Sequence, residues 1–359
     1  MTGVYISYPF CSQKCTYCNF ASGVFPRELE ARYVDALVRE IANYPWSEAA
    51  DTIYLGGGTP SQMSDADLER VLAAIPGANW TEATIEAAPG SLTRERVETW
   101  RRLGINRVSL GVQSFVTREL ARTGRKHSAA IVEAEIALLR DAGIRNINID
   151  LIAGLPGQNA KTWTESLQSI ERLDPPHVSV YMLEVDEDSR LGSEVLLNGQ
   201  RYGAPDVPPE DAIVSMYEEA VDALAAQGIA RYEISNFARP GWESLHNLKY
   251  WRLEPYIGFG ADAHSFDGRW RWQNVESPGE YVNRPDPGIE RTLAQPGQEK
   301  FFVGLRLSQG VKPAPEEWET FAKPIRYFVE EGLLEQDGGL LRLTRRGVLL
   351  SNEVFAEFL

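Results

Sequence analysis

The chain has 359 residues, of which 43% are hydrophobic, 24% charged and 10% aromatic. This composition is typical of a soluble globular protein and excludes collagen, coiled-coil and disordered chains. Thirty-six Lys and Arg against 51 Asp and Glu give a formal charge of −15, the wrong sign for a nucleic-acid or anionic membrane partner. The sequence contains neither the roughly 18 apolar residues of a membrane span nor a signal peptide, so we expect a cytoplasmic protein with no integral membrane segment.

Predicted strands and helices alternate through residues 4–235. The strands are expected at 4–8, 52–55, 84–87, 107–110, 146–152, 177–182 and 231–235. Helices are expected at 27–44, from 64 onward, and at 93–103, 128–142, 161–173 and 209–227. Ser64 is a suitable N-cap, and Gly104 and Gly143 stand where helix C-caps require glycine.

Strands separated by helices predict an α/β fold with a parallel sheet, and the absence of an early G-x-G-x-x-G argues against a dinucleotide-binding fold. A partial, TIM-like (β/α) barrel, open or closed, fits better. In such barrels the loops after the strands hold the functional groups. Here those loops contain the cysteines, a glycine run, Glu86, Gln113 and Asp150, so we expect one site.

The last part of the chain has a different pattern. A turn-rich stretch at 278–287 precedes two helical segments, a hairpin at 333–343 turning on Asp337-Gly338-Gly339, and a final helix. We therefore predict a barrel at 1–240, a connecting segment at 241–297 and a small winged-helix-like domain at 298–359. That domain has eight Lys or Arg against ten Asp or Glu, which favours a packing or lid role over DNA binding.

All three cysteines lie in Cys11-Ser-Gln-Lys-Cys15-Thr-Tyr-Cys18, directly after the first predicted strand. An odd number of cysteines packed this closely is not a disulfide framework. Three thiolates can hold three irons of a [4Fe–4S] cluster and leave the fourth iron open to another ligand. The alternatives are buried free cysteines or a structural zinc that lacks its fourth ligand.

This C-x3-C-x2-C motif in a repeating β/α chain resembles the radical S-adenosylmethionine (SAM) superfamily. Gly57-Gly58-Thr59-Pro60 is similar to that family's glycine motif, where a backbone without Cβ approaches the methionyl group of SAM. The resemblance implies that SAM chelates the open iron through its amino and carboxylate groups, and that its reductive cleavage gives a 5′-deoxyadenosyl radical. A plain glycine turn is the alternative for this segment.

Within the superfamily, the order of Tyr5, PFC, GGGTP, IEAAPG, GVQSF, Arg125 and IDLIAGLPGQ resembles the oxygen-independent coproporphyrinogen III oxidase group. The resemblance implies two sets of cofactor-binding residues. Beside the cluster-bound SAM it implies Tyr5, Gly57, Gly58, Thr59 and Glu86, and near a second SAM it implies Tyr17, Gln113, Arg125 and Asp150. The alternative is that Gln113 and Asp150 tie strand ends to the backbone and that Arg125 forms a surface ion pair.

Two features depart from the oxidase pattern. Phe20 stands where the oxidases have a further cysteine. Only ten residues precede Cys11, so we expect the N-terminal extension of the oxidases to be absent. A third feature, His246-Asn-Leu-Lys-Tyr250-Trp251, resembles the H-N-x-x-Y-W signature of the oxidase-like heme chaperones of the HemW group.

The signature implies that His246 is an axial heme ligand and that the aromatic pair lies against a porphyrin face. A hydrogen-bonded core histidine is the alternative. His264 lies in a glycine turn that resembles a late cofactor-contacting segment, whereas His127 and His177 are expected to be ordinary structural residues.

We therefore expect a heme chaperone that holds a [4Fe–4S] cluster, SAM and heme, and that delivers heme to an acceptor protein the sequence does not identify. The second hypothesis is an oxidase that decarboxylates the propionates of coproporphyrinogen III. A radical SAM methyltransferase or other tailoring enzyme is a third, which H-N-x-x-Y-W disfavours. The sequence leaves open whether the chain forms a homodimer.

Overall fold

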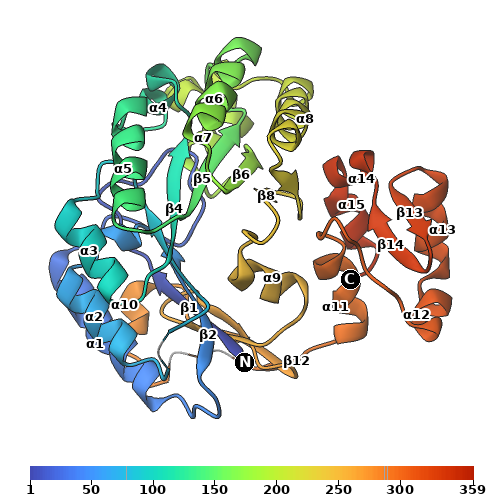
Figure 1. Cartoon of the computed structure of the whole chain (residues 1–359). Helices are drawn as coiled ribbons and strands as arrows, with labels where there is room; N and C mark the ends of the chain where they lie inside the picture. Colours follow the sequence, from blue (N-terminus) through green and yellow to red (C-terminus); the bar gives the residue numbers. More distant parts are fainter. Residues whose placement is uncertain (78, 287, 289) are drawn as a thin grey trace.

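The computed structural model describes residues 1–77, 79–286, 288 and 290–359, and within them twelve strands form one sheet (Figure 1). From edge to edge the strands are β12 (Thr292–Leu293), β11 (Trp270–Gln273), β10 (His264–Phe266), β9 (Tyr256–Phe259), β1 (Thr2–Tyr8), β2 (Ala50–Gly57), β3 (Glu82–Ala87), β4 (Arg107–Gln113), β5 (Asn146–Ala153), β6 (His177–Met182), β8 (Asn236–Ala238) and β7 (Ala230–Arg231). Because this order has two ends, the barrel is open.

Strands β1 to β6 are parallel neighbours, and a helix follows each of them. These helices are α1 (Arg27–Asn43), α2 (Asp65–Ala73), α3 (Arg94–Arg102), α5 (Ala129–Asp141), α6 (Ala160–Leu173) and α8 (Glu210–Ala226). Shorter helices interrupt the connections, namely η1 (Pro60–Gln62), α4 (Thr117–Arg122), α7 (Arg190–Leu196) and η2 (Arg201–Asp206). The predicted partial (β/α) barrel is confirmed, and helices α1 to α6 cover its outer face (Figure 1).

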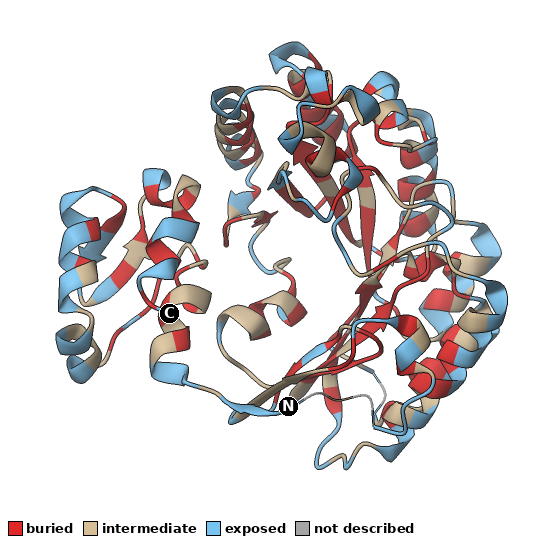
Figure 2. Cartoon of the chain, turned by 180° about the vertical axis from the view of Figure 1, so that it is seen from behind, coloured by how far each residue is buried: buried red, intermediate tan, exposed pale blue. Residues whose placement is uncertain are grey.

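Local sequence signals explain these elements. On β1, Val4 and Ile6 are fully buried, and alternation turns Tyr5 to the opposite, inner face. The Ser64 hydroxyl caps α2 by accepting a hydrogen bond from the amide of Asp67 at 3.1 Å. Gly104 adopts a φ of 94° just beyond α3, as a helix C-cap requires. Buried residues run along the strands and the helix faces turned toward them (Figure 2).

The predicted seventh parallel strand at 231–235 is wrong. In its place, β7 and β8 form a short antiparallel pair, and β8 also pairs antiparallel with β6. Residues 232–235 make the turn between β7 and β8, because the Glu233 carboxylate accepts a hydrogen bond from the amide of Ser235 at 2.9 Å. This side-chain hydrogen bond stabilises the turn, so the segment does not form the strand that its sequence favours.

Residues 245–286 and 290–293 contain more helix and strand than the sequence predicts. Helix α9 (Leu245–Trp251) precedes β9, which pairs in parallel with β1, and β10 to β12 extend the sheet in antiparallel fashion. The stretch expected to be only turns contains α10 (Pro278–Tyr281), because Pro278 occupies its first turn and the Ser277 hydroxyl accepts from the amide of Glu280. Position 287 lies outside the described residues.

The C-terminal unit comprises helices and the predicted hairpin. Its elements are α11 (Pro296–Gly304), α12 (Pro315–Thr320), α13 (Ala322–Glu330), β13 (Leu334–Asp337), β14 (Leu340–Leu343), α14 (Arg345–Leu349) and α15 (Ser351–Ala356). It lies beside α8 and α9 (Figure 1), and Arg345 binds Asp222 of α8 at 2.9 Å. None of the helices in the described ranges is long and apolar enough to cross a membrane.

Candidate functional site

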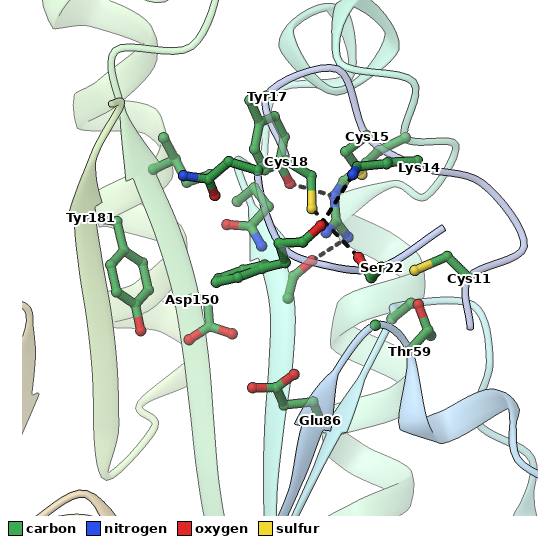
Figure 3. A pocket seen from close by; sticks show the side chains of 18 of the residues that line it. Cys11, Lys14, Cys15, Tyr17, Cys18, Ser22, Thr59, Glu86, Asp150 and Tyr181 are labelled. Atoms are coloured by element: carbon green, nitrogen blue, oxygen red, sulfur yellow. Dashed lines mark hydrogen bonds between the residues drawn. The ribbon is translucent and has the colours of Figure 1, made fainter. Parts of the chain in front are cut away.

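A cavity of about 380 Å³ opens at the carboxyl ends of the parallel strands, where the sequence predicts the site (Figure 3). The loops after β1 and β2 and the ends of β3 to β6 line it. Of the residues predicted from the sequence, those that line it are Cys11, Cys15, Tyr17, Cys18, Gly57, Gly58, Thr59, Glu86, Gln113, Arg125 and Asp150. The fold thus gathers into one cavity residues that are up to 139 positions apart in the chain.

The three thiols lie on the cysteine loop, which we define as residues 9–26. Hydrogen bonds from the amide of Cys11 to the carbonyl of Gly23, at 2.8 Å, and from Gly23 to Pro9, at 2.9 Å, close its base. The middle of the loop is held by Thr16, whose amide donates to the carbonyl of Thr123 and whose carbonyl accepts from Leu191. The barrel therefore fixes the loop from two sides.

All three cysteines are free, partly buried and turned toward the cavity (Figure 3). Burial raises the pKa of the Cys11 thiol. Within the described residues, no set of three or more His, Cys, Asp or Glu side chains surrounds a point where one metal ion would sit. A [4Fe–4S] cluster does not need such a point, because each of its irons takes its own thiolate.

The glycine turn after β2 lies against the base of the cysteine loop. Gly57 adopts a φ of 101°, which residues other than glycine rarely adopt. A Cβ on Gly58 would come within 2.8 Å of the Tyr8 carbonyl oxygen and the Pro9 carbonyl carbon. The amide of Thr59 donates to the carbonyl of Phe10 at 3.0 Å. The glycines therefore allow this backbone to approach the cysteine loop closely.

Glu86 projects into the cavity from β3 (Figure 3). Its Oε1 accepts a hydrogen bond from the hydroxyl of Tyr54 at 3.0 Å. Burial, and then the charge of Asp150, raise the pKa of Glu86 to about 7. This carboxylate can therefore change its charge near neutral pH, when a cationic or hydroxyl-bearing ligand approaches.

Tyr17, Arg125 and Gln113 form a second group in the same cavity. The Arg125 guanidinium donates to the Tyr17 hydroxyl at 3.0 Å and to the carbonyl of Gly111 at 2.6 Å, so it is not the surface ion pair considered as an alternative. Gln113 has a φ of 69°, and its buried Oε1 lacks a hydrogen-bond partner among the described residues. An unpaired acceptor beside a cation is typical of a ligand-binding position.

Asp150 is held by two neighbouring side chains. It accepts from Ser109 at 3.1 Å and from Asn148 at 2.7 Å, and burial raises its pKa. These bonds agree with the alternative structural role, whereas its place in the cavity agrees with cofactor binding. Both roles are compatible with one carboxylate, because each oxygen can accept a further bond.

Three predicted residues do not line this cavity. Tyr5 lies next to it on β1, since a Cβ on Gly56 would meet both the Tyr5 ring and the Glu86 carboxylate at 3.2 Å. His264 is exposed on β10, opposite Gln273. His246 lies on α9 and is fully buried.

Both imidazole nitrogens of His246 are paired. Nδ1 lies 3.0 Å from the Thr52 hydroxyl, and Nε2 lies 2.8 Å from the Tyr250 hydroxyl. Burial, followed by the charges of Lys249 and Arg107, lowers the pKa of His246 to about 3, so the ring is neutral at pH 7. In this arrangement His246 is a hydrogen-bonded core histidine, and iron ligation would require one of these bonds to break.

The start of α9 is held by a carboxylate that the sequence analysis missed. Glu82 on β3 accepts from the amides of Leu245 and His246, both at 3.0 Å, and lies 3.9 Å from the buried guanidinium of Arg107. Tyr54 and the cavity-lining Ser109 and Tyr181 were also missed. These residues could have been found from the sequence, because they occupy inward-facing positions on the predicted barrel strands.

Fold and cavity together define a radical SAM protein. The sequence profile of the Radical SAM superfamily matches residues 5–170, and that of the HemN C-terminal domain matches residues 292–350. The solved structure of coproporphyrinogen III oxidase (HemN) from Escherichia coli, titled a radical SAM enzyme, superposes with a TM-score of 0.85. It covers 99% of this chain and 89% of that chain at 21% identity, which establishes a shared fold.

Relatives that match along most of both chains identify the family within this superfamily. Heme chaperone HemW of Bacillus subtilis (strain 168) is 35% identical over 381 residues, covering 100% of this chain and 99% of the relative. Heme chaperone HemW of Escherichia coli (strain K12) is 36% identical over 334 residues, covering 91% of this chain and 81% of the relative. The chain belongs to the HemW family.

Proposed function

We propose that this chain is a heme chaperone, which binds heme and passes it to an acceptor protein under the control of a [4Fe–4S] cluster and SAM. The observation that carries the proposal is the similarity to proteins named heme chaperone along essentially the full length of both chains. Phe20, in the place of the oxidases' additional cysteine, agrees with this proposal and weakens the oxidase alternative.

Cys11, Cys15 and Cys18 would hold the cluster. Three sulfur donors on a loop that the barrel fixes from two sides fit a cluster with one open iron. When bound, the cluster supplies the electron that cleaves SAM in this superfamily. The chain's own contribution is to position the thiols at the mouth of the cavity and to shield them partly from water.

Gly57, Gly58, Thr59 and Glu86 would bind the SAM next to the cluster, with Tyr5 behind them. The glycine turn leaves room for a ligand at the backbone, and the Glu86 carboxylate would accept hydrogen bonds from an ammonium or ribose hydroxyl group. Tyr17, Gln113, Arg125 and Asp150 would contact a second SAM or another part of the ligand. The unpaired Oε1 of Gln113 supports this role.

His246 remains a predicted heme ligand, and His264 remains a predicted cofactor-binding residue. For His246 the prediction requires a rearrangement, because Thr52 and Tyr250 occupy its nitrogens. Cleavage of one bond would free a nitrogen for iron. A His246→Gln variant whose heme spectrum differs from that of the wild type would support ligation, whereas identical spectra would assign His246 to the core.

We further infer a cytoplasmic location and no nucleic-acid partner, in line with the acidic composition. The predicted domain limits, 1–240, 241–297 and 298–359, remain proposals. So do the transfer of heme to an acceptor protein and the formation of a homodimer.

The decisive experiment uses cluster-reconstituted protein under anaerobic conditions. Incubation with SAM, reductant and coproporphyrinogen III, followed by mass spectrometry, should give no decarboxylated tetrapyrrole. The same preparation should bind hemin and transfer it to a heme-free acceptor. Conversion over many turnovers, abolished in Cys18→Ala, would overturn the chaperone assignment in favour of the oxidase.

A further inference from the structure

A second cavity, of about 550 Å³, lies outside the barrel. It runs between the C-terminal half of α1, the strands β9 and β11, and residues 281–286, which begin with the last residue of α10. Among the described residues, it shares no lining residue with the cysteine cavity. We call it the outer groove.

Cations line the outer groove although the protein as a whole is acidic. Arg39 comes from α1, Arg284 follows α10 and Arg291 precedes β12. Arg284 pairs with Glu280 at 3.1 Å, but no carboxylate of the described residues lies within 4 Å of the Arg39 or Arg291 guanidinium. On a chain with a formal charge of −15, two uncompensated guanidinium groups in one cavity are suited to an anionic ligand.

Aromatic rings form much of the wall. The Arg291 guanidinium lies over the Trp272 ring, 4.3 Å from its centre, in a cation–π contact that covers this face of the ring. Phe259 and Tyr44 meet edge to face with ring centres 5.5 Å apart. Phe259 is only 1% exposed, so a flat apolar ligand would meet the half-buried Tyr44 ring and the Arg291–Trp272 pair.

The acids of the outer groove are Glu40 and Asp286. Glu40 is engaged by the protein itself, because it accepts from the amide of Gly260 at 2.9 Å, from Asn274 at 2.7 Å and from the Tyr281 hydroxyl at 2.5 Å. Its carboxylate is thus turned to the floor of the groove and is not paired with the arginines. Asp286 is exposed at the rim.

We propose that the outer groove binds a tetrapyrrole, with its ionised propionate carboxylates on Arg39 and Arg291 and its macrocycle against Tyr44 and the Arg291–Trp272 pair. This inference rests on the proposed heme function. A tetrapyrrole combines a large flat apolar body with carboxylates at one edge, which matches an aromatic wall with two free arginines. The groove belongs largely to residues 241–297, the segment that contains the H-N-x-x-Y-W motif.

The test is a hemin titration of the full chain with its cluster reconstituted, followed by absorbance in the Soret region. We compare the wild type with Arg39→Glu/Arg291→Glu and with a milder Arg39→Gln/Arg291→Gln variant. The matched control, Arg118→Glu/Arg326→Glu, changes the net charge equally at exposed arginines that line neither cavity. Circular dichroism and iron content verify that each variant is folded.

We expect both groove variants to bind hemin at least about tenfold more weakly than the wild type, because each loses charge-assisted hydrogen bonds. The control should stay within about twofold. Hemin dimethyl ester, which lacks the carboxylates, should bind the wild type as weakly as hemin binds the glutamine variant, and the variant should not weaken it further.

Equal hemin affinity of the wild type and the groove variants would overturn the outer-groove site while leaving the proposed heme function intact. Equal weakening in groove and control variants would reveal a general charge effect and also overturn it. Tight binding of the dimethyl ester to the wild type would exclude the carboxylate contacts. A wild type that does not bind hemin would contradict the proposed function itself, and the groove with it.

Discussion

The hydroxyl of Tyr54 donates a hydrogen bond to Oε1 of Glu86 at 3.0 Å. The Tyr54 ring also packs near His246 on α9, with the two ring centres 5.5 Å apart. Tyr54 thus joins the cavity carboxylate to the helix that bears the H-N-x-x-Y-W motif. A change in α9 can therefore reach the predicted SAM site through one aromatic side chain.

Tyr54→Phe should weaken SAM binding severalfold and shift its pH dependence. The hydroxyl stabilises the ionised form of Glu86, so its removal should raise the pKa of that carboxyl above about 7. Isothermal titration between pH 6 and pH 9, on cluster-loaded protein, should show the midpoint of binding at a higher pH than in the wild type. An unchanged midpoint would mean that Tyr54 does not tune Glu86.

Glu86→Gln should stabilise the cluster-free protein at alkaline pH. The folded-state pKa of Glu86, about 7, lies above the ordinary value of 4.5, so the wild type loses stability as the pH rises through this interval. The gain from the substitution should be near zero at pH 4.5 and reach at most about 3 kcal/mol at pH 8. Urea unfolding at both pH values measures it. A gain that does not depend on pH would contradict a buried, titrating Glu86.

His246→Ala should lower the free energy of unfolding by about 2–4 kcal/mol at pH 8, because it leaves a cavity and two unpaired hydroxyls. The folded-state pKa of His246, about 3, lies below its ordinary value of 6.5. The stability that depends on neutral His246 is therefore present above pH 6.5 and is lost as the pH falls toward 3.

At pH 5 the difference in free energy of unfolding between the wild type and His246→Ala should consequently be about 2 kcal/mol smaller than at pH 8. His127→Ala is a useful comparison, because His127 is also buried but makes one hydrogen bond, to the carbonyl of Val112. If the wild type and His246→Ala had the same free energy of unfolding at pH 8, the interpretation of His246 as a stabilising core residue would be wrong.

Glu82→Ala should destabilise the protein by about 3–5 kcal/mol. The substitution leaves the buried guanidinium of Arg107 without its carboxylate and the first amides of α9 without their acceptor. The exposed Glu98→Ala on α3 serves as the control and should change stability by less than about 0.5 kcal/mol. Chemical denaturation of both variants measures these changes. Similar losses of stability in Glu82→Ala and Glu98→Ala would contradict the stabilising role of the Glu82 carboxylate.

Cys18→Ala should reduce the iron bound after anaerobic reconstitution from about four atoms per chain to near none, because two thiolates hold a cubane cluster poorly. Iron analysis and the visible absorbance of the cluster provide the measurement. Ser12→Ala, in the same loop but without a sulfur, should retain the wild-type iron content. Full iron retention in Cys18→Ala would rule out Cys18 as a ligand.

Much of the barrel and its cavity was predictable from the sequence. The cysteine spacing, the glycine turn and the ends of the strands are local signals, and parallel strands bring their carboxyl ends to one edge. The surroundings of His246 were not predictable, because Thr52 and Tyr54 belong to a strand almost two hundred residues away. The short β7–β8 pair and the outer groove depend on similar distant contacts.

The pairing of β1 with β9 has a consequence for how the protein is made. Residues 3–6 lie in register with residues 256–259, so one edge of the strand that leads into the cysteine loop stays uncovered until most of the chain has been synthesised. Contacts this distant slow folding and leave a strand edge available for wrong pairing. A nascent chain therefore carries all three cysteines long before their support is complete, and cluster insertion is expected to follow synthesis of residue 259.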